Sequence, residues 1–277
     1  ADKFDRGYER LIVVLGADHH GYEARVRGAV RALGHPDERF EVLFFQLVNL
    51  LRDGKPYKMG KRLGNLITIE EIVEEIDEAA QRKGTGTDAL RYFYLSRRSD
   101  TTIDIDIELA KKASLDNPVF YLQMGYARLC SIERRAAEVF DLLTPAYSER
   151  LVQRVSHPDE LAMLAQLGRF PAVVAEAAEL REPHRLVFYL NELSQQFQSY
   201  FTRLKNEGDA ILPLKAQMAV DGWEQRWDQE KTLGRLLWIK AIKTVYGAGL
   251  ELLGITALER MEPLEDRTHD RDNEEAK

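Results

Sequence analysis

Two lysines that bracket a Met-Gly pair are the residues of this chain best suited to phosphate chemistry. Lys58 and Lys61 flank Met59 and Gly60, and Pro56 just before them disfavours regular structure. A lysine ammonium is a compact charge on a flexible stem, which suits phosphate groups that move during a reaction. Charge pattern alone more often marks a solvated surface loop. The alternative is a cationic loop that closes on a nucleoside triphosphate.

A carboxylate follows the first apolar run of the chain. Residues 11–15 read Leu-Ile-Val-Val-Leu, which is typical of a buried parallel strand, and Gly16 and Asp18 follow this run. A carboxylate at this place can accept hydrogen bonds from ribose hydroxyls, while Gly16 lets a ligand approach the backbone closely. Asp18 could equally cap the next helix. Both interpretations put Asp18 at the end of a strand.

Two histidines and a glutamine belong to the same neighbourhood. His19 and His20 are adjacent, so their side chains point in different directions, and no further ligand stands at metal-binding spacing. We therefore expect no zinc or other metal site. One histidine would contact a nucleoside and the other would pack against a helix. Gln46 ends the second strand, where it either contacts adenosine or satisfies a strand-end backbone group.

Aromatic and polar side chains gather on the helices expected in the second half of the chain. Tyr121, Gln123, Tyr126 and Arg128 lie on one predicted helix, and Tyr200 lies on a later one. Aromatic residues at helical spacing usually form the core of a bundle. The sharper hypothesis is a platform on which splayed-out RNA bases stack, with Arg128 contacting phosphate or base. The spacing leaves both interpretations open.

The elements that would position the first group of residues form a strand–helix–strand unit. Apolar runs at 11–15 and 40–51 enclose a helical segment at 22–33, which ends before Gly34. This order predicts one crossover unit of a doubly wound sheet. Ligands of such sheets bind at the carboxyl ends of the strands, which is where the carboxylate and the histidines fall.

The second half is predicted to be a bundle of about five helices. Residues 186–204 and 238–252 carry apolar side chains every three or four positions, as expected of buried helical stripes. Two helices are expected within 159–181, with a break near Pro171, and residues 81–87 are expected to form a flexible link. The predicted domains are an α/β region at 1–115, a helical domain at 116–261 and a charged tail at 262–277.

Composition excludes several classes of protein. The 277 residues carry a net charge of −7 and a single cysteine, Cys130, which rules out an internal disulfide and makes a cytoplasmic setting the default. No apolar run approaches the roughly 18 residues that suggest a membrane span, so we expect no membrane association. The acidic balance argues against non-specific coating of nucleic acid but allows a local basic face that binds RNA.

Six segments in order resemble arginyl-tRNA synthetase, a class I aminoacyl-tRNA synthetase. They span nearly the whole chain, which makes the set far more specific than any one of them. The segments are residues 16–22, 46–50 (Gln-Leu-Val-Asn-Leu), 58–62, 88–91 (Asp-Ala-Leu-Arg), 116–123 and 252–261 (LLGITALERM). The resemblance implies an α/β partial Rossmann (nucleotide-binding) region followed by an all-α anticodon-binding helical bundle.

The resemblance also implies an arginine–tRNA ligase that uses ATP, accompanied by Mg²⁺, to charge tRNA-Arg with arginine. Lys58 and Lys61 match the lysines of the Lys-Met-Ser-Lys signature, which stabilise the triphosphate, and we expect Lys61 to contribute more. Gly60 departs from the usual serine of that signature. The nucleotide-contacting set implied by the resemblance is Gly16, Asp18, His19, His20, Gln46 and Met59. The tRNA-contacting set, in which Met261 would lie near the anticodon, is Tyr121, Gln123, Tyr126, Arg128, Tyr200 and Met261.

One part of the family pattern is missing. The sequence contains no tetrapeptide of the His-Ile-Gly-His type, which sits against the ATP phosphates in class I synthetases. We therefore expect this chain to carry the second half of the catalytic domain and the whole anticodon-binding bundle. It would pair with a separate N-terminal half or form part of a longer protein. The alternative is a noncatalytic tRNA-binding or regulatory module derived from a synthetase.

Overall fold

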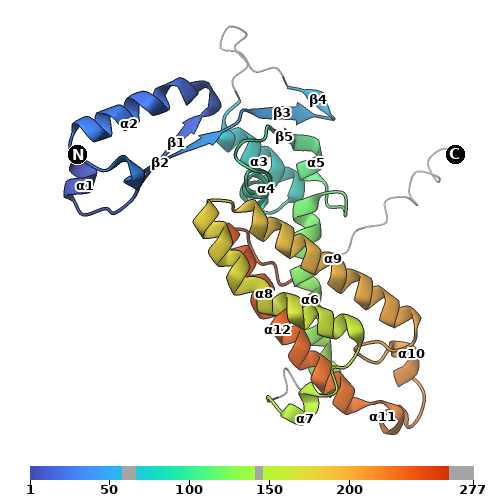
Figure 1. Cartoon of the computed structure of the whole chain (residues 1–277). Helices are drawn as coiled ribbons and strands as arrows, with labels where there is room; N and C mark the ends of the chain where they lie inside the picture. Colours follow the sequence, from blue (N-terminus) through green and yellow to red (C-terminus); the bar gives the residue numbers. More distant parts are fainter. Residues whose placement is uncertain (58–66, 141–145, 262–277) are drawn as a thin grey trace, which may run out of the picture.

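The structure is a computed structural model that describes residues 1–57, 67–140 and 146–261. Three parts follow one another along the chain: a small unit with two strands, a second sheet flanked by helices, and a long helical bundle (Figure 1). In the view of Figure 1 the small unit lies to the left of the second sheet, and the bundle extends below that sheet. The predicted fold class, an α/β region followed by helices, is confirmed.

The first part, the β1–β2 unit (residues 1–46), is the predicted strand–helix–strand arrangement. Its strands are parallel and paired along their whole length, from Leu11 opposite Phe40 to Gly16 opposite Phe45. Only Phe4 and Phe40 are buried apolar side chains in this unit. Its elements are α1 (Asp2–Asp5), β1 (Leu11–Gly16), η1 (Ala17–Tyr22), α2 (Glu23–Ala32), η2 (Asp37–Arg39) and β2 (Phe40–Phe45).

The second sheet begins just after the predicted end of the second strand. Strand β2 ends at Phe45, next to the strand end predicted at Gln46, and residues 48–52 form a further strand that belongs to a different sheet. Strand β3 pairs in parallel with β5 and antiparallel with β4 through a tight turn at Asp53 and Gly54, both at positive φ. The strands are β3 (Val48–Arg52), β4 (Lys55–Pro56) and β5 (Ile103–Asp106), and the accompanying helices are α3 (Ile69–Ala80), α4 (Thr85–Leu95) and α5 (Ile107–Lys111).

The link between α3 and α4 is shorter and better held than predicted. Helix α4 already begins at Thr85, so only residues 81–84 lie between the helices. The Asp77 carboxylate accepts hydrogen bonds from the backbone N–H groups of Gly84 (2.9 Å) and Gly86 (2.7 Å). Gly86 also packs directly on α3, because a Cβ there would lie 2.4 Å from the Val73 carbonyl oxygen. Gly86 therefore allows α4 to pack closely on α3, and it does not mark a flexible link.

Four long helices build the bundle. The predicted stripe at 186–204 is one face of α9 and is buried, from Leu186 to Leu204. The break predicted within 159–181 is absent: α8 is continuous, with Pro171 at an exposed position inside it. The long helices are α6 (Pro118–Phe140), α8 (Pro158–Leu180), α9 (His184–Asn206) and α12 (Gln229–Leu253), and the short ones are α7 (Glu149–Val152), α10 (Lys215–Met218) and α11 (Trp223–Arg226).

Within the described ranges, α8 is the one helix whose length and apolar content would suffice to cross a membrane. It packs along α9, and 22% of its most apolar stretch is buried. Glu160 near its start is fully buried and paired with Arg235 of α12.

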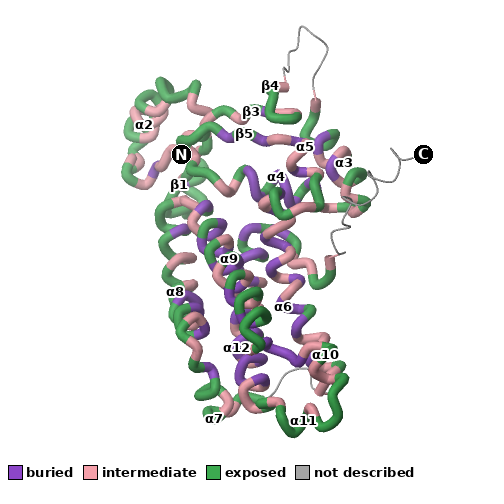
Figure 2. The backbone as a smooth tube through the Cα atoms, turned by 90° about the vertical axis from the view of Figure 1, so that its right-hand side faces the viewer, coloured by how far each residue is buried: buried purple, intermediate pink, exposed green. Residues whose placement is uncertain are grey.

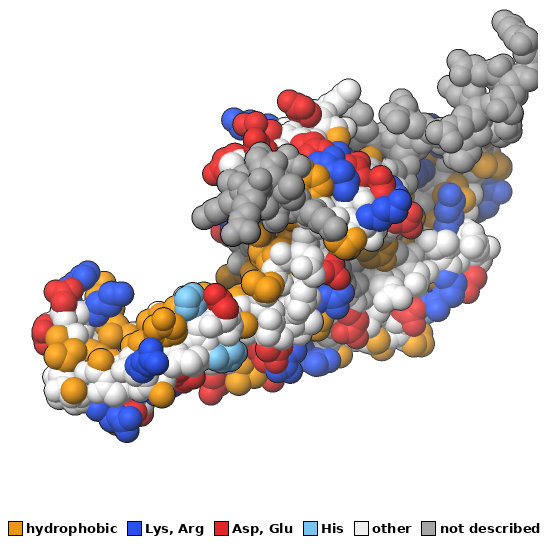
Figure 3. Space-filling model, turned by 90° about the horizontal axis from the view of Figure 1, so that it is seen from above, with side chains coloured by type: hydrophobic (Ala, Val, Ile, Leu, Met, Phe, Trp, Pro, Cys, Tyr) orange, Lys and Arg blue, Asp and Glu red, His pale blue; other side chains and the backbone are white. Residues whose placement is uncertain are grey.

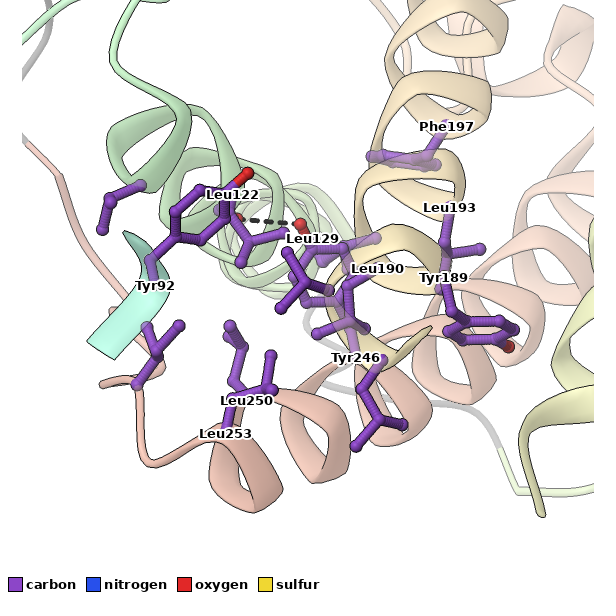
Figure 4. Close-up of a cluster of buried hydrophobic side chains, with 14 of the residues drawn as sticks. Tyr92, Leu122, Leu129, Tyr189, Leu190, Leu193, Phe197, Tyr246, Leu250 and Leu253 are labelled. Atoms are coloured by element: carbon purple, nitrogen blue, oxygen red, sulfur yellow. Dashed lines mark hydrogen bonds between the residues drawn. The ribbon is translucent and has the colours of Figure 1, made fainter. Parts of the chain in front are cut away.

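A single apolar core runs from the second sheet into the bundle. It extends from Leu50 to Ile255 and includes side chains from α3, α4 and all four long helices, so it crosses the predicted boundary at residue 116 without a gap. Figure 2 shows buried backbone inside the bundle and mostly intermediate or exposed backbone around α2 and β1. The Tyr246 hydroxyl donates a 2.8 Å hydrogen bond to the Leu122 carbonyl oxygen and joins α12 to α6 inside this core (Figure 4).

Candidate functional site

The predicted nucleotide-contacting residues gather at the carboxyl ends of β1 and β2. Gly16 is the last residue of β1, and the Asp18 side chain in η1 folds back toward it. A Cβ at Gly16 would lie 2.5 Å from the Asp18 Oδ1, so a larger residue there would displace the carboxylate. The Asp18 side chain is 70% exposed and lies 3.5 Å from the His19 Nε2. A glycine and an accessible carboxylate therefore share one strand end.

The two histidines take different roles in this unit. The His20 ring stacks on Phe44 of β2, with 3.8 Å between ring centroids. The His19 ring meets Tyr22 edge to face at 5.6 Å and is half exposed. The described residues include no group of three His, Cys, Asp or Glu side chains that could hold a metal ion. This geometry leaves Asp18, His19 and His20 exposed, and His20 in addition stacks on a residue of β2.

Gln46 lies where β2 ends and the chain turns toward the second sheet. Its backbone N–H donates to the Ser99 carbonyl oxygen at 2.9 Å, which fastens the end of β2 to the loop that follows α4. The Gln46 side chain is partly exposed. The strand-end role that the sequence allowed is therefore filled by the backbone, and a contact of the side chain with adenosine stays a prediction.

The cationic loop itself, with Lys58, Met59 and Lys61, falls outside the described residues. Its upstream anchor is described. The Tyr57 N–H donates to the Leu50 carbonyl oxygen at 2.7 Å, and the Arg52 guanidinium lies 5.4 Å from the centre of the Tyr57 ring. The described chain before the loop therefore ends at Tyr57, next to the edge strand of the second sheet.

A cluster of four charged side chains supports this anchor. Arg52 donates to both Glu75 carboxylate oxygens, at 2.7 and 2.9 Å, and to Glu108 at 3.1 Å. Lys111 bridges the same two carboxylates at 2.5 and 2.8 Å. The hydrogen bond from Arg52 holds the pKa of Glu75 below its ordinary value. The cluster ties β3 to α3 and α5.

Tyr121 and Arg128 lie two turns apart on one face of α6, the face that meets α9. The Arg128 guanidinium hydrogen-bonds to the Gln198 side-chain oxygen and lies 5.3 Å from the centre of the Phe201 ring. Burial lowers the pKa of Arg128, and the nearby Tyr121 opposes that effect. An arginine held against an aromatic ring by a neutral amide keeps its charge for an anionic ligand.

Tyr126 belongs to a different face of α6. Its ring lies 6.3 Å from Tyr246 and packs near Gly247 of α12. Burial raises the pKa of its hydroxyl. The segment after α12 returns along α6, where the Arg134 guanidinium donates to the Glu259 carbonyl oxygen at 2.9 Å, two residues before Met261. The structure thus brings Glu259, close to Met261, onto α6 but separates Tyr126 from the Arg128 face.

Two of the predicted RNA contacts are corrected. Gln123 is 2% exposed, and its amide donates to Asp88 at 2.7 Å and to the Thr256 carbonyl oxygen at 3.1 Å. Tyr200 is 1% exposed, and its hydroxyl donates to the Glu160 carboxylate. Because both side chains are enclosed and fully engaged, neither can meet an RNA base in this conformation.

Phe201 is the aromatic residue that sequence reasoning missed. It follows Tyr200 and packs at the edge of the core, with its ring 6.1 Å from that of Phe197 and 5.3 Å from the Arg128 guanidinium. The signal was available, because Leu186, Leu190, Leu193 and Phe197 define a stripe that passes through Tyr200 but not through its neighbour. The stripe therefore predicts that Tyr200 is buried and that Phe201 is more exposed.

The chain is similar to known proteins along almost its whole length. Residues 122–261 match the family model of the DALR anticodon binding domain. An arginine–tRNA ligase from Symbiobacterium thermophilum is 40% identical over 260 residues, which cover 94% of this chain and 42% of that protein. One from Desulfosudis oleivorans is 38% identical over 263 residues, with the same two coverages. The chain therefore spans about two fifths of the length of the curated relatives it matches.

A solved structure shows the same similarity in its fold. The structure of Thermus thermophilus arginyl-tRNA synthetase superposes with a TM-score of 0.68 at 25% identity, covering 91% of this chain and 41% of that one. The predicted resemblance is thereby confirmed at the level of both sequence and fold.

Proposed function

The chain belongs to the DALR anticodon binding domain family, and on that premise we propose that its helical bundle binds the anticodon region of transfer RNA. The observation that carries the proposal is the family match over residues 122–261, which begins inside α6 and includes every helix of the bundle after it. The α6–α9 face supplies the chemistry. It combines the Tyr121 and Phe201 rings with the Arg128 guanidinium.

Each of these groups suits single-stranded RNA. Bases of a loop can be splayed out and stacked on aromatic rings, and an arginine plane can stack on a base or pair with a phosphate. Arg128 is held by the Gln198 amide and not by a carboxylate, so its charge is not neutralised by that partner. A protein with a net charge of −7 needs such a local cationic site to attract RNA.

We further propose that the protein acts as an arginine–tRNA ligase, in which arginine, ATP and tRNA-Arg give arginyl-tRNA, AMP and pyrophosphate. Support comes from the relatives, which are named arginine–tRNA ligases. Gly16 and Asp18 would hold the ribose of ATP, since both lie at the carboxyl end of β1. Lys58 and Lys61 would stabilise the triphosphate and its accompanying Mg²⁺. The lone Cys130 fits the cytoplasm that we propose as the location.

The β1–β2 unit supports a further partner in catalysis. Several apolar side chains on or next to its strands are exposed, among them Val14 (61%), Ile12 (43%) and Leu47 (68%). Figure 3 shows hydrophobic side chains over the outer surface of this unit. We propose that the remaining part of a synthetase catalytic domain packs there, supplied by the same protein or by a separate one. That part would complete the arginine and ATP sites.

Binding of RNA to this chain tests the first proposal. Arg128→Gln is expected to weaken binding of a tRNA-Arg transcript by about 1–3 kcal/mol, because one cationic or stacking contact is lost. Arg169→Gln is the matched control, since it removes the same charge from an exposed position on α8. Fluorescence anisotropy at several salt concentrations measures both. Equal losses for the two variants would contradict a site at Arg128.

Aminoacylation with and without an added N-terminal half tests the second proposal. Activity is expected only in the mixture, and Lys61→Ala is expected to cost about 2–4 kcal/mol of transition-state stabilisation in adenylate formation. An unchanged rate in Lys61→Ala would remove the assigned role of the loop. Binding of tRNA without aminoacylation in any mixture would favour the noncatalytic module.

A further inference from the structure

Asp88 is a buried carboxylate at which three distant segments of the chain meet. It is 3% exposed and lies on α4, in the part of the chain that precedes the bundle. Its Oδ1 accepts hydrogen bonds from the Thr256 backbone N–H at 3.0 Å and from the Thr256 hydroxyl at 3.1 Å. Its Oδ2 accepts from the Gln123 amide at 2.7 Å, and the Arg82 guanidinium lies 3.5 Å away.

The Gln123 amide closes this arrangement. It donates a second hydrogen bond, of 3.1 Å, to the Thr256 carbonyl oxygen. Thr256 is therefore held through its N–H, its hydroxyl and its carbonyl at once, by one residue of α4 and one of α6. These contacts depend on the tertiary fold, because Asp88 and Thr256 are 168 positions apart in the sequence.

Thr256 lies near the start of the segment that leads to Met261, here named the terminal segment (residues 254–261). Helix α12 ends at Gly254, whose φ of +64° reverses the chain, and the side chain of Arg91 lies directly over that glycine. Farther on, the Glu259 carbonyl oxygen accepts from Arg134 of α6 at 2.9 Å. The terminal segment is therefore fixed to α6 at two places, near Gln123 and at Arg134.

We propose that Asp88 is a positioning residue for RNA binding: it holds the terminal segment on α6, so that the α6 face around Tyr126 and the residues up to Met261 form a second surface for the anticodon loop, in addition to the α6–α9 face around Arg128. This inference rests on the proposed binding of tRNA and adds to it a residue that lies outside the bundle and touches no RNA. Because α4 packs on α3 and β5, the same carboxylate fixes that surface relative to the second sheet.

Asp88 suits this role because its two carboxylate oxygens accept hydrogen bonds, which an apolar side chain of the same size could not do. A buried carboxylate with only apolar neighbours would be costly, whereas here each oxygen accepts from donors that also need partners. Asparagine has the same shape but turns one acceptor into a donor, which would then face the donating Gln123 amide. Asp88→Asn therefore disturbs the hold on Thr256 with little change of volume.

The test compares Asp88→Asn with Tyr189→Phe in the full chain. The control removes a different buried hydrogen bond, from the Tyr189 hydroxyl to the Gln166 carbonyl oxygen at 3.0 Å between α9 and α8, away from the terminal segment. Amide hydrogen exchange of residues 255–261 and affinity for the anticodon stem-loop of tRNA-Arg are measured below both unfolding transitions. Asp88→Asn is expected to speed exchange in the segment and to weaken RNA binding about tenfold. Tyr189→Phe is expected to change neither.

Thr256→Val serves as a second variant if Asp88→Asn does not fold, because it removes the hydroxyl donor but keeps the backbone N–H. It is expected to move both readouts in the same direction by a smaller factor, and Thr256→Ser should restore them. Unchanged exchange, faster exchange with unchanged affinity, or equal losses in Tyr189→Phe would each overturn the role of Asp88. Failure of the unsubstituted chain to bind the stem-loop would instead defeat the proposed function, and the inference with it.

Discussion

The β1–β2 unit and the helical bundle use apolar residues in opposite ways. In the first 46 residues two apolar side chains are buried, whereas a continuous core joins Leu50 to Ile255. The predicted nucleotide contacts therefore stand on strand ends in a sparsely packed unit, with the Asp18 carboxylate largely exposed. The predicted RNA contacts lie on helices α6 and α9, which bury another of their faces in the core of the bundle. Apolar residues at regular spacing are therefore buried only where other elements of the same chain pack against them, as they do in the bundle and not in the β1–β2 unit.

Charged residues differ between the two regions in the same way. In the β1–β2 unit the Arg6–Asp2 pair, at 3.5 Å, is exposed and the Arg10–Glu41 pair, at 3.8 Å, is partly exposed. In the bundle, Arg235 is 1% exposed and donates to Glu160 at 2.7 Å and to both Asp209 oxygens. Burial alone would lower the pKa of Arg235, but its hydrogen bonds to Asp209 and Glu160 outweigh that effect and raise it.

The largest expected effect breaks this buried ion pair. Arg235→Leu is expected to lower the free energy of unfolding of the bundle by about 3–5 kcal/mol, because it leaves Glu160 buried and without its cation. Arg150→Met, in a pair with Glu230 whose side chains are 76% and 42% exposed, should cost less than about 1 kcal/mol. Urea denaturation followed by tryptophan fluorescence measures both, since Trp223, Trp227 and Trp238 all lie in the bundle. Similar losses would mean that Arg235 is not enclosed.

The next effect sharpens the comparison through apolar side chains alone. Leu190→Ala, at a fully buried position on α9, is expected to cost about 2–5 kcal/mol, because it removes core contacts and leaves a cavity. Val14→Ala, on the exposed face of β1, should change the same fluorescence transition by less than about 0.5 kcal/mol. A loss above about 1 kcal/mol in Val14→Ala would show that the two regions unfold together, against the separation that their cores indicate.

Periodicity predicted the elements of both regions, but it did not predict how they are joined. Gln46 marked the end of the second strand, but nothing in residues 47–51 shows that they begin a strand of another sheet. The proline in α8 was read as a break, yet Pro171 is exposed, where water can satisfy the carbonyl that loses its partner. The local sequence pattern therefore predicted where helices and strands lie, but not which elements pack against one another.

The site residues show the same division. The stripe that predicted α9 already contained Tyr200, so its burial followed from the pattern and its proposed contact with RNA did not. Gln123 has no such signal, because its partners Asp88 and Thr256 come from segments 35 and 133 positions away. A buried polar residue finds its partners through the tertiary fold, and no spacing rule in one chain reveals them.

The smallest expected effect concerns pH and a histidine of the bundle. His184 begins α9 and is 6% exposed, with its ring 5.4 Å from Phe188. Burial lowers the pKa of His184 below its ordinary value of 6.5, an effect only partly opposed by the nearby Glu182. In the unfolded chain the same imidazole takes up a proton near its ordinary pKa, so the unfolded state binds more protons as pH falls through that value. The resulting stability is fully present above pH 6.5 and is lost progressively below it.

Urea denaturation at about pH 7.5 and about pH 5.5 measures this contribution, since the charge of histidine changes within that window. The free energy of unfolding should fall between the two conditions, and His184→Gln should reduce the fall because glutamine cannot take up the proton. An equally steep fall in His184→Gln would assign the acid sensitivity to other groups. The exposed His19 of the β1–β2 unit offers a comparison at the same pH values: with its side chain half exposed, His19→Gln should leave the bundle's fluorescence transition unchanged, because that transition reports a core which His19 does not enter.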